Sequence, residues 1–304
     1  MLGRIRLLLG LIRFSHTVFA LPFALSSAVL AWQDRWPGDE PIDGRQLALD
    51  LAGILLCMVF ARSAAMAFNR LADRHIDAGN PRTAGRHLPA GLLTPAAVWA
   101  FTAACSASFV ASTLLFVVSA DNWWPLYLSV PVLLFVCAYS YTKRFTALAH
   151  FWLGASLLLA PLSAWVALRG TDGLGGTPLV LGLAVLFWVV GFDILYACQD
   201  VEFDRKAGLA SVPARLGVRH SLRVALACHV VMVALLVLLF WVAQPLRGAV
   251  YGLGVAAVAA LVAYEHWLVR PDDLSRVNQA VFNVNGVISI GLFVVVLVQL
   301  AVGA

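Results

Sequence analysis

Apolar runs of about 20 residues recur along this 304-residue chain and constrain its fold more than any other feature. A run of that length crosses the hydrocarbon core of a bilayer as one α-helix. Only 12% of the residues are charged, against about a quarter in soluble domains. We therefore predict an all-α fold, a multi-pass transmembrane helical bundle of about nine spans. The predicted spans are residues 17–33, 47–69, 92–119, 124–141, 148–169, 178–199, 221–241, 248–268 and 281–302.

The first run follows Arg4, Arg6 and Arg13, so a cleaved signal peptide is the alternative to a span there. The further runs, and the lack of a small-residue cleavage pattern, favour a span. Most Lys and Arg residues of the connections fall on one side if the N-terminus is cytoplasmic, as the positive-inside rule requires. We predict a multi-pass protein of the inner cell membrane with a cytoplasmic N-terminus and an exported C-terminus.

The cysteine residues and the net charge limit which binding partners are expected. The five Cys residues lie singly in apolar runs without C-x-x-C spacing, so we expect small core side chains and no disulfide. The net charge of +5 comes mainly from cytoplasmic connections, which indicates lipid headgroups of the bilayer and phosphate-bearing substrates. We predict no nucleic acid partner, and the oligomeric state stays open.

Polar residues gather after the second run, in AFNRLADRHIDAGNPRTAGRHLPAG. Arg62, Asn69, Asp73 and Asp77 are spaced seven, four and four, which places them on one face of a helix. Two carboxylates and an amide oxygen on one stripe form a ligand set for a hard divalent cation such as Mg²⁺.

The connection after the sixth run repeats this pattern in GFDILYACQDVEFDRKAGLASVPARLG. Asp193, Asp200 and Asp204 are spaced seven and four and share a helical face. One D-x-x-x-D at the end of a span is often only a pair of solvated charges that anchor the helix end. Two such stripes, each followed by Arg or Lys, are harder to explain as solvated anchors. We predict a single membrane-embedded domain over 1–304 with two related Asp-rich halves, about 1–145 and 146–304.

Arg62 and Asp193 lie one to two turns inside their apolar runs, where an unpaired charge is costly and usually marks a functional site. The pattern indicates a polar cavity between helices that opens to the cytoplasm. Carboxylates hold Mg²⁺, and Mg²⁺ with Arg and Lys binds a diphosphate and makes it a better leaving group. A lipid with a diphosphate head would fit such a cavity.

These residues resemble the UbiA superfamily of intramembrane prenyltransferases. Its first motif, N-D-x-x-D-x-x-x-D, matches at Asn69, Asp73 and Asp77, and the RTAGRHLPAG that follows is also similar. A third motif, Y-x-x-x-K, matches at Tyr139 and Lys143, and the N-terminal IRFSHTVFALPFAL is similar as well. Beyond Gly217 only the hydropathy and the number of spans agree. The second motif matches at Asp193, Tyr196, Asp200, Asp204, Lys206, Gly208 and Ser211.

The resemblance implies a Mg²⁺-dependent prenyltransferase. The reaction would transfer a polyprenyl group from polyprenyl diphosphate to an aromatic acid of the 4-hydroxybenzoate type, in ubiquinone or menaquinone biosynthesis. The implied metal ligands are Asn69, Asp73, Asp77, Asp200 and Asp204. The residues implied to bind the diphosphate are Arg62, Arg82, Tyr139, Lys143 and Lys206. The implied catalytic residues are Asp73, Asp77, Asp200, Asp204 and Asp193, the last as the base that takes the ring proton.

Arg70 departs from the family pattern, which has Asp at this position of the first motif. If the missing carboxylate is a metal ligand, Asn69, Asp73 and Asp77 must suffice. The variant looks like a bacterial branch described as 4-hydroxybenzoate polyprenyltransferase-like, some members of which serve the futalosine route to menaquinone. A dihydroxynaphthoate is therefore an alternative acceptor, and Arg13 or Arg144 could hold an acceptor carboxylate.

Two other classes of function compete with this interpretation. A CDP-alcohol phosphotransferase also uses clustered Asp and Mg²⁺, but the D-G-x-x-A-R run expected before its D-x-x-x-D is not found. A transporter would use Arg62 and Asp193 as an ion path, but the charges gather at one membrane face. The seven His residues show no H-x-x-x-H pair, and we expect them at the surface, at the membrane interface or in packing.

Overall fold

A computed structural model describes residues 2–11, 19–35 and 43–303, which form helices and connections without a β-strand. The predicted all-α fold is confirmed. In this part of the chain, eight helices are long and apolar enough to cross a membrane, close to the nine expected. The predicted first span corresponds to α2 (Leu21–Arg35), whose 15 residues are short for a span, and residues 17 and 18 lie outside the described residues.

The contacts divide the chain into two units, Met1–Thr17 with Asp43–Thr142, and Val18–Ile42 with Lys143–Ala304. Val18–Ile42, with α2, belongs to the second unit. The predicted division into two related Asp-rich halves, about 1–145 and 146–304, stays a prediction. The helices of the first unit are α1 (Leu2–Leu11), α3 (Gly44–Ala72), α4 (Arg74–Gly79), α5 (Pro95–Ala120) and α6 (Trp124–Thr142). Those of the second are α2, α7 (Ala149–Arg169), α8 (Gly176–Ala197), η2 (Cys198–Asp200), α9 (Val201–Lys206), α10 (Val212–Leu216), α11 (Val218–Val242), η3 (Gln244–Leu246), α12 (Ala249–Leu268), the π-helix η4 (Gln279–Val284) and α13 (Asn285–Gly303).

In the first unit, α3 packs along α5, and local capping sets where both helices begin. The Asp43 carboxylate accepts hydrogen bonds from the backbone N–H groups of Arg45 and Gln46. Thr94 caps α5 through the N–H of Ala97, and Pro95 occupies the first helical turn. Such caps satisfy backbone donors that a helix start leaves without a partner. The Asp43 cap extends α3 at its N-terminal end beyond the apolar run that was predicted from the sequence.

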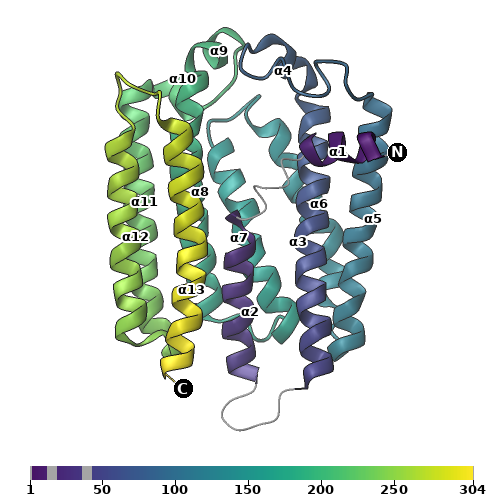
Figure 1. Ribbon diagram of the computed structural model, residues 1–304, viewed down its shortest axis with the longest axis vertical. Coiled ribbons are helices and arrows are strands. Elements are labelled where there is room, and N and C mark those ends of the chain that lie inside the picture. The colour runs from purple at the N-terminus through teal and green to yellow at the C-terminus, as the bar shows by residue number, and fades with distance from the viewer. Residues whose placement is uncertain (1, 12–18, 36–42, 304) are drawn as a thin grey trace. The chain divides into compact units, whose positions relative to one another are not determined.

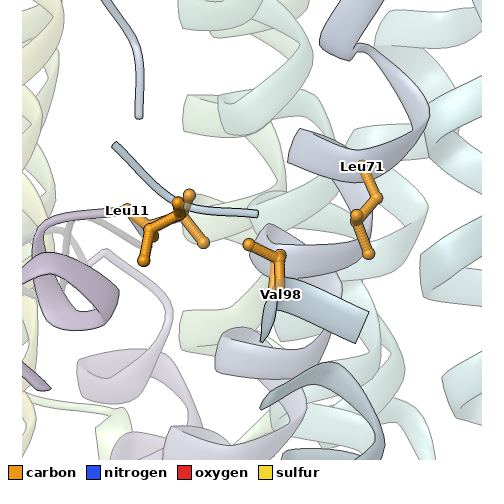
Figure 2. Close-up of a cluster of buried hydrophobic side chains, with 5 residues drawn as sticks. Leu11, Leu71 and Val98 are labelled. Atoms are coloured by element: carbon orange, nitrogen blue, oxygen red, sulfur yellow. The ribbon is translucent and has the colours of Figure 1, made fainter. Parts of the chain in front are cut away.

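A cluster of buried apolar side chains joins three helices of the first unit, where Leu11 of α1, Leu71 of α3 and Val98 of α5 meet (Figure 2). Figure 1 shows α1 lying across the end of α3 rather than along it. Full burial of a Leu or Val side chain stabilises a fold by about 1.5–3 kcal/mol. The cluster therefore fixes the end of α3, directly before Asp73 of the first motif.

In the second unit, α8 packs against both α7 and α11, while α2 packs against α7 (Figure 1). Gly191 allows the close approach of α11, because a Cβ added there would lie 2.2 Å from ring atoms of His229. Only glycine leaves room for the imidazole at this point of the interface.

A buried polar network also holds the second unit together. Asn285 of α13 accepts a hydrogen bond from the Trp188 indole of α8 and donates to the Glu265 carboxyl group of α12, at 2.7 Å. The Nδ1 atom of His229 on α11 lies 2.9 Å from Nε2 of His266 on α12. Trp188, His229, Glu265 and Asn285 are at most 1% exposed. Both of these His residues thus belong to a hydrogen-bonded network, which their spacing in the sequence did not predict.

Many large apolar side chains on the long helices are exposed, among them Leu134 at 67% and Leu253 at 72%. A soluble protein rarely exposes apolar surface of this extent, whereas lipid tails cover it without penalty. With the eight apolar helices, this surface identifies a multi-pass membrane protein.

Candidate active site

The first Asp motif continues the backbone of α3 through a short break. Asp73 ends α3 with φ −93° and ψ 4°, and α4 begins at the next residue. The Asp73 N–H donates to the Asn69 carbonyl at 2.9 Å, and the Asp77 N–H donates to the Asp73 carbonyl at 2.8 Å. Each bond joins residues four apart as in an α-helix, so the predicted helical register persists across the break.

The side chains around Asn69 engage one another. The Asn69 amide donates to the Asp73 carboxylate at 3.0 Å and to the Ser140 hydroxyl at 3.4 Å. Its carbonyl oxygen accepts from Arg70 at 3.3 Å. Arg70, the position that departs from the family pattern, is only 8% exposed and contacts a predicted metal ligand. In this conformation the Asn69 oxygen is shared with Arg70, and its role as a ligand stays a prediction.

The loop after the first motif folds back onto Asp77. Arg86 binds both carboxylate oxygens of Asp77, at 2.7 and 2.8 Å, and the Thr83 hydroxyl donates to the Asp77 backbone carbonyl at 3.0 Å. Asp77 is buried, and a buried carboxylate is tolerated where a cation or donors compensate it. Arg86 was not among the predicted site residues, although it lies in the RTAGR segment, whereas the predicted Arg82 is exposed.

Arg62 lies on α3 eleven residues before Asp73, which is about 16 Å along the helix axis. Its Nε is buried and makes no hydrogen bond to any residue that the structure describes. A buried cationic group without a partner is costly, so an anion bound beside it would be stabilised strongly.

The second Asp motif repeats the backbone arrangement of the first. Asp193 lies on α8, Asp200 ends η2, and Asp204 lies on α9. η2 and α9 follow the C-terminal end of α8 directly (Figure 1). Asp200 has φ −103° and ψ 6°, close to the angles of Asp73. This sparsely populated backbone region is one in which many active-site residues lie. In both motifs the first Asp of D-x-x-x-D therefore occupies a helix junction of the same geometry.

The loop after the second motif likewise returns to its last carboxylate. Asp204 is hydrogen-bonded to the Ser211 side chain, and its backbone carbonyl accepts from the Leu209 N–H at 2.8 Å. Gly208 adopts φ +67°, a left-handed conformation that favours glycine and turns the chain back. The Lys143 carbonyl anchors the loop by accepting from the Ala210 N–H at 2.7 Å. These contacts explain why Gly208 and Ser211 follow the motif at these positions.

Asp193 is paired with His150 of α7, 43 residues earlier in the chain. The imidazole Nδ1 lies 2.7 Å from the Asp193 carboxylate, and Nε2 lies 3.2 Å from the Val212 backbone nitrogen. His150 is 5% exposed. This pair could not be predicted from the sequence, because a lone His in an apolar run resembles a packing residue.

The other predicted residues differ in burial and in the unit to which they belong. Tyr139 is partly buried near the end of α6 in the first unit, and Lys143 is the first residue of the second segment of the second unit. Lys206 and Arg144 are exposed, and Arg13 lies outside the described residues.

The predicted metal ligands divide between the units, with Asn69, Asp73 and Asp77 in the first and Asp200 and Asp204 in the second. Within residues 2–11, 19–35 and 43–303, no three His, Cys, Asp or Glu side chains form a group that could hold a metal ion. The predicted donors are carboxylate oxygens in both motifs and the Asn69 amide oxygen in the first, the ligand type that fits Mg²⁺. The complete ligand set stays a prediction.

The chain is similar to known proteins of one family. Residues 14–287 match the model of the UbiA prenyltransferase family. The chain is 32% identical to a 4-hydroxybenzoate octaprenyltransferase of Nitrosomonas europaea over 84% of this chain and 85% of the relative. A similar relative of Marinobacter nauticus is also 32% identical, with 86% of each chain covered.

Solved structures share the fold. An apo UbiA homologue from Aeropyrum pernix has a TM-score of 0.78 and 33% identity, with 93% of this chain and 98% of that chain covered. A UbiA homologue from Archaeoglobus fulgidus, bound to DMAPP and Mg²⁺, has a TM-score of 0.71 and 19% identity, with 97% and 99% covered. These matches decide against the transporter and the CDP-alcohol phosphotransferase. The chain belongs to the UbiA prenyltransferase family.

Proposed function

We propose that this protein transfers a polyprenyl group from polyprenyl diphosphate to the ring of a 4-hydroxybenzoate-type aromatic acid, in ubiquinone or menaquinone biosynthesis. The names of the relatives from Nitrosomonas europaea and Marinobacter nauticus support the reaction and the acceptor. The observation that carries the proposal is the shared construction of the two motifs, each with an Asp at a helix junction and a second Asp held by its own loop.

Both motifs would act on one diphosphate. Asn69, Asp73, Asp77, Asp200 and Asp204 would hold Mg²⁺, which when bound neutralises the diphosphate and makes it a better leaving group. The DMAPP and Mg²⁺ in the Archaeoglobus fulgidus structure support this choice of ion. The positive charge that would bind the diphosphate comes from Arg62, Arg82, Lys143 and Lys206, with Tyr139 as a further contact.

The transfer then follows from the charges that develop. The bond between the prenyl carbon and the diphosphate oxygen breaks, and its electron pair leaves with the diphosphate. A π-electron pair of the aromatic ring forms the new carbon–carbon bond to the allylic cation. The ring proton passes to the Asp193 carboxylate, and the electron pair of the C–H bond restores the aromatic ring. Asp193 would therefore be needed for loss of the ring proton, but not for the earlier ionisation of the prenyl donor.

The location of the site follows from the charge pattern of the connections. The two Asp motifs follow the second and sixth predicted runs, whose ends share the more basic side of the chain. We place this side in the cytoplasm, with the protein in the inner membrane, the N-terminus cytoplasmic and the active site open to the cytoplasm.

Mass spectrometry of the products tests the proposal most completely. Purified protein in detergent would be incubated with Mg²⁺, a panel of prenyl diphosphates, and either 4-hydroxybenzoate or a dihydroxynaphthoate. We expect a product with the mass of the prenylated acid, and the acceptor that gives it identifies the quinone pathway. Hydrolysis or cyclisation of the diphosphate without any prenylated acceptor would contradict the transferase function and favour terpene formation.

A further inference from the structure

His150 makes two hydrogen bonds that together determine its protonation and its tautomer. The Val212 backbone nitrogen can only donate, so Nε2 of His150 must offer its lone pair to that N–H group. An imidazole with a free lone pair on Nε2 is neutral and carries its hydrogen on Nδ1. The Nδ1–H group then donates to the Asp193 carboxylate at 2.7 Å.

We propose that His150 is a positioning residue for Asp193. Its Nδ1–H group holds one carboxylate oxygen, Oδ2, and so fixes the orientation of the whole group. Oδ1 makes no hydrogen bond to a residue that the structure describes, and the Asp193 side chain is 19% exposed. The free oxygen is thus available to take a proton while its partner oxygen is held. Fixing a base in this way supplies the geometry that proton transfer requires.

His150 itself is held on both sides. It is the second residue of α7, its side chain is 6% exposed, and Val212 begins α10 directly after Ser211. Since Ser211 binds Asp204, the imidazole connects the proposed base to the loop that holds another motif carboxylate. If His150 had a structural role alone, that role would be to anchor this loop through Nε2.

Two isosteric substitutions separate positioning from anchoring. The amide nitrogen of Asn occupies about the place of His Nδ1, whereas the amide oxygen of Gln reaches about the place of Nε2. His150→Asn thus keeps the donor to Asp193 and loses the acceptor for Val212. His150→Gln keeps the acceptor and loses the donor.

The inference rests on the proposed function, and its test measures two rates. One is prenylation of 4-hydroxybenzoate by geranyl diphosphate, resolved into kcat and KM; the other is diphosphate release without acceptor. We expect His150→Asn to prenylate within a few-fold of wild type. We expect His150→Gln to lose about 10-fold to 100-fold in kcat, the usual effect of removing a supporting partner, with KM for the donor unchanged. Diphosphate release should stay at the wild-type rate in both variants.

The ordering of the two variants decides the inference. If His150→Gln keeps its turnover while His150→Asn loses it, or if both folded variants lose it equally, His150 does not position Asp193. Thermal unfolding in detergent verifies that both variants are folded. Failure of the proposed function would appear differently, as wild-type protein that releases diphosphate without making a prenylated acid.

Discussion

Asn285 offers a quantitative test of the packing in the second unit. Its side chain joins α8 to α12, because it accepts from the Trp188 indole and donates to the Glu265 carboxyl group. Asn285→Ala would leave two fully buried polar groups without these partners. Each such group costs about 1–3 kcal/mol, so the sum is about 2–6 kcal/mol. Hydrogen bonds between membrane helices average nearer 0.6 kcal/mol each, which gives about 1 kcal/mol for two, and we therefore expect a loss of about 1–4 kcal/mol.

Thermal unfolding of the purified protein in detergent measures this effect. Val287→Ala is the matched control, because Val287 lies two residues further along α13 and is 57% exposed. We expect Asn285→Ala to lower Tm clearly and Val287→Ala to change it little. If both variants unfold at the same temperature, the network does not stabilise the unit and the reasoning is refuted.

Three further substitutions have expected outcomes in the same assay. Gly191→Ala should lower the free energy of unfolding by about 1–3 kcal/mol, because the new methyl group meets the His229 ring. Gly252→Ala is the control, because its methyl group enters open space and should have little effect. Equal effects of the two variants would argue against the close approach of α8 and α11. Arg62→Met should leave the unliganded protein at least as stable, since it removes a buried Nε that makes no hydrogen bond to a described residue. The same variant should abolish the rise in Tm that Mg²⁺ with inorganic diphosphate gives the wild type, and a full rise would remove Arg62 from the site. Gly208→Ala should cost about 1–2 kcal/mol because its φ is +67°, and an unchanged Tm would show that the loop relaxes.

The long helices could be predicted because their bounds nearly coincide with those of the apolar runs. The predicted runs 124–141, 148–169 and 248–268 differ from α6, α7 and α12 by one residue at an end. Hydropathy was less accurate where other forces set the end. Capping by Asp43 starts α3 three residues before the apolar run, and the π-helix at Gln279–Val284 has no signature in the hydropathy.

The candidate site was predictable only as far as local spacing reaches. Residues four apart lie on one helical face, so both D-x-x-x-D stripes could be identified from the sequence. The Arg86–Asp77 pair spans nine residues and the His150–Asp193 pair spans 43, and both depend on how loops and helices pack. Glu265 did leave a signal, as the only acidic residue of its apolar run, and its burial in a polar network follows the rule for intramembrane carboxyl groups.

The most direct test of the central claim is the rate of Mg²⁺-dependent prenyl transfer by the Asp73→Asn and Asp200→Asn proteins. These positions are the two helix-junction carboxylates, one in each motif. Each substitution keeps the shape of the side chain and removes a charge that would hold the ion. We predict that each variant loses at least about 100-fold in kcat while remaining folded. Retention of Mg²⁺-dependent transfer in both variants would contradict the account.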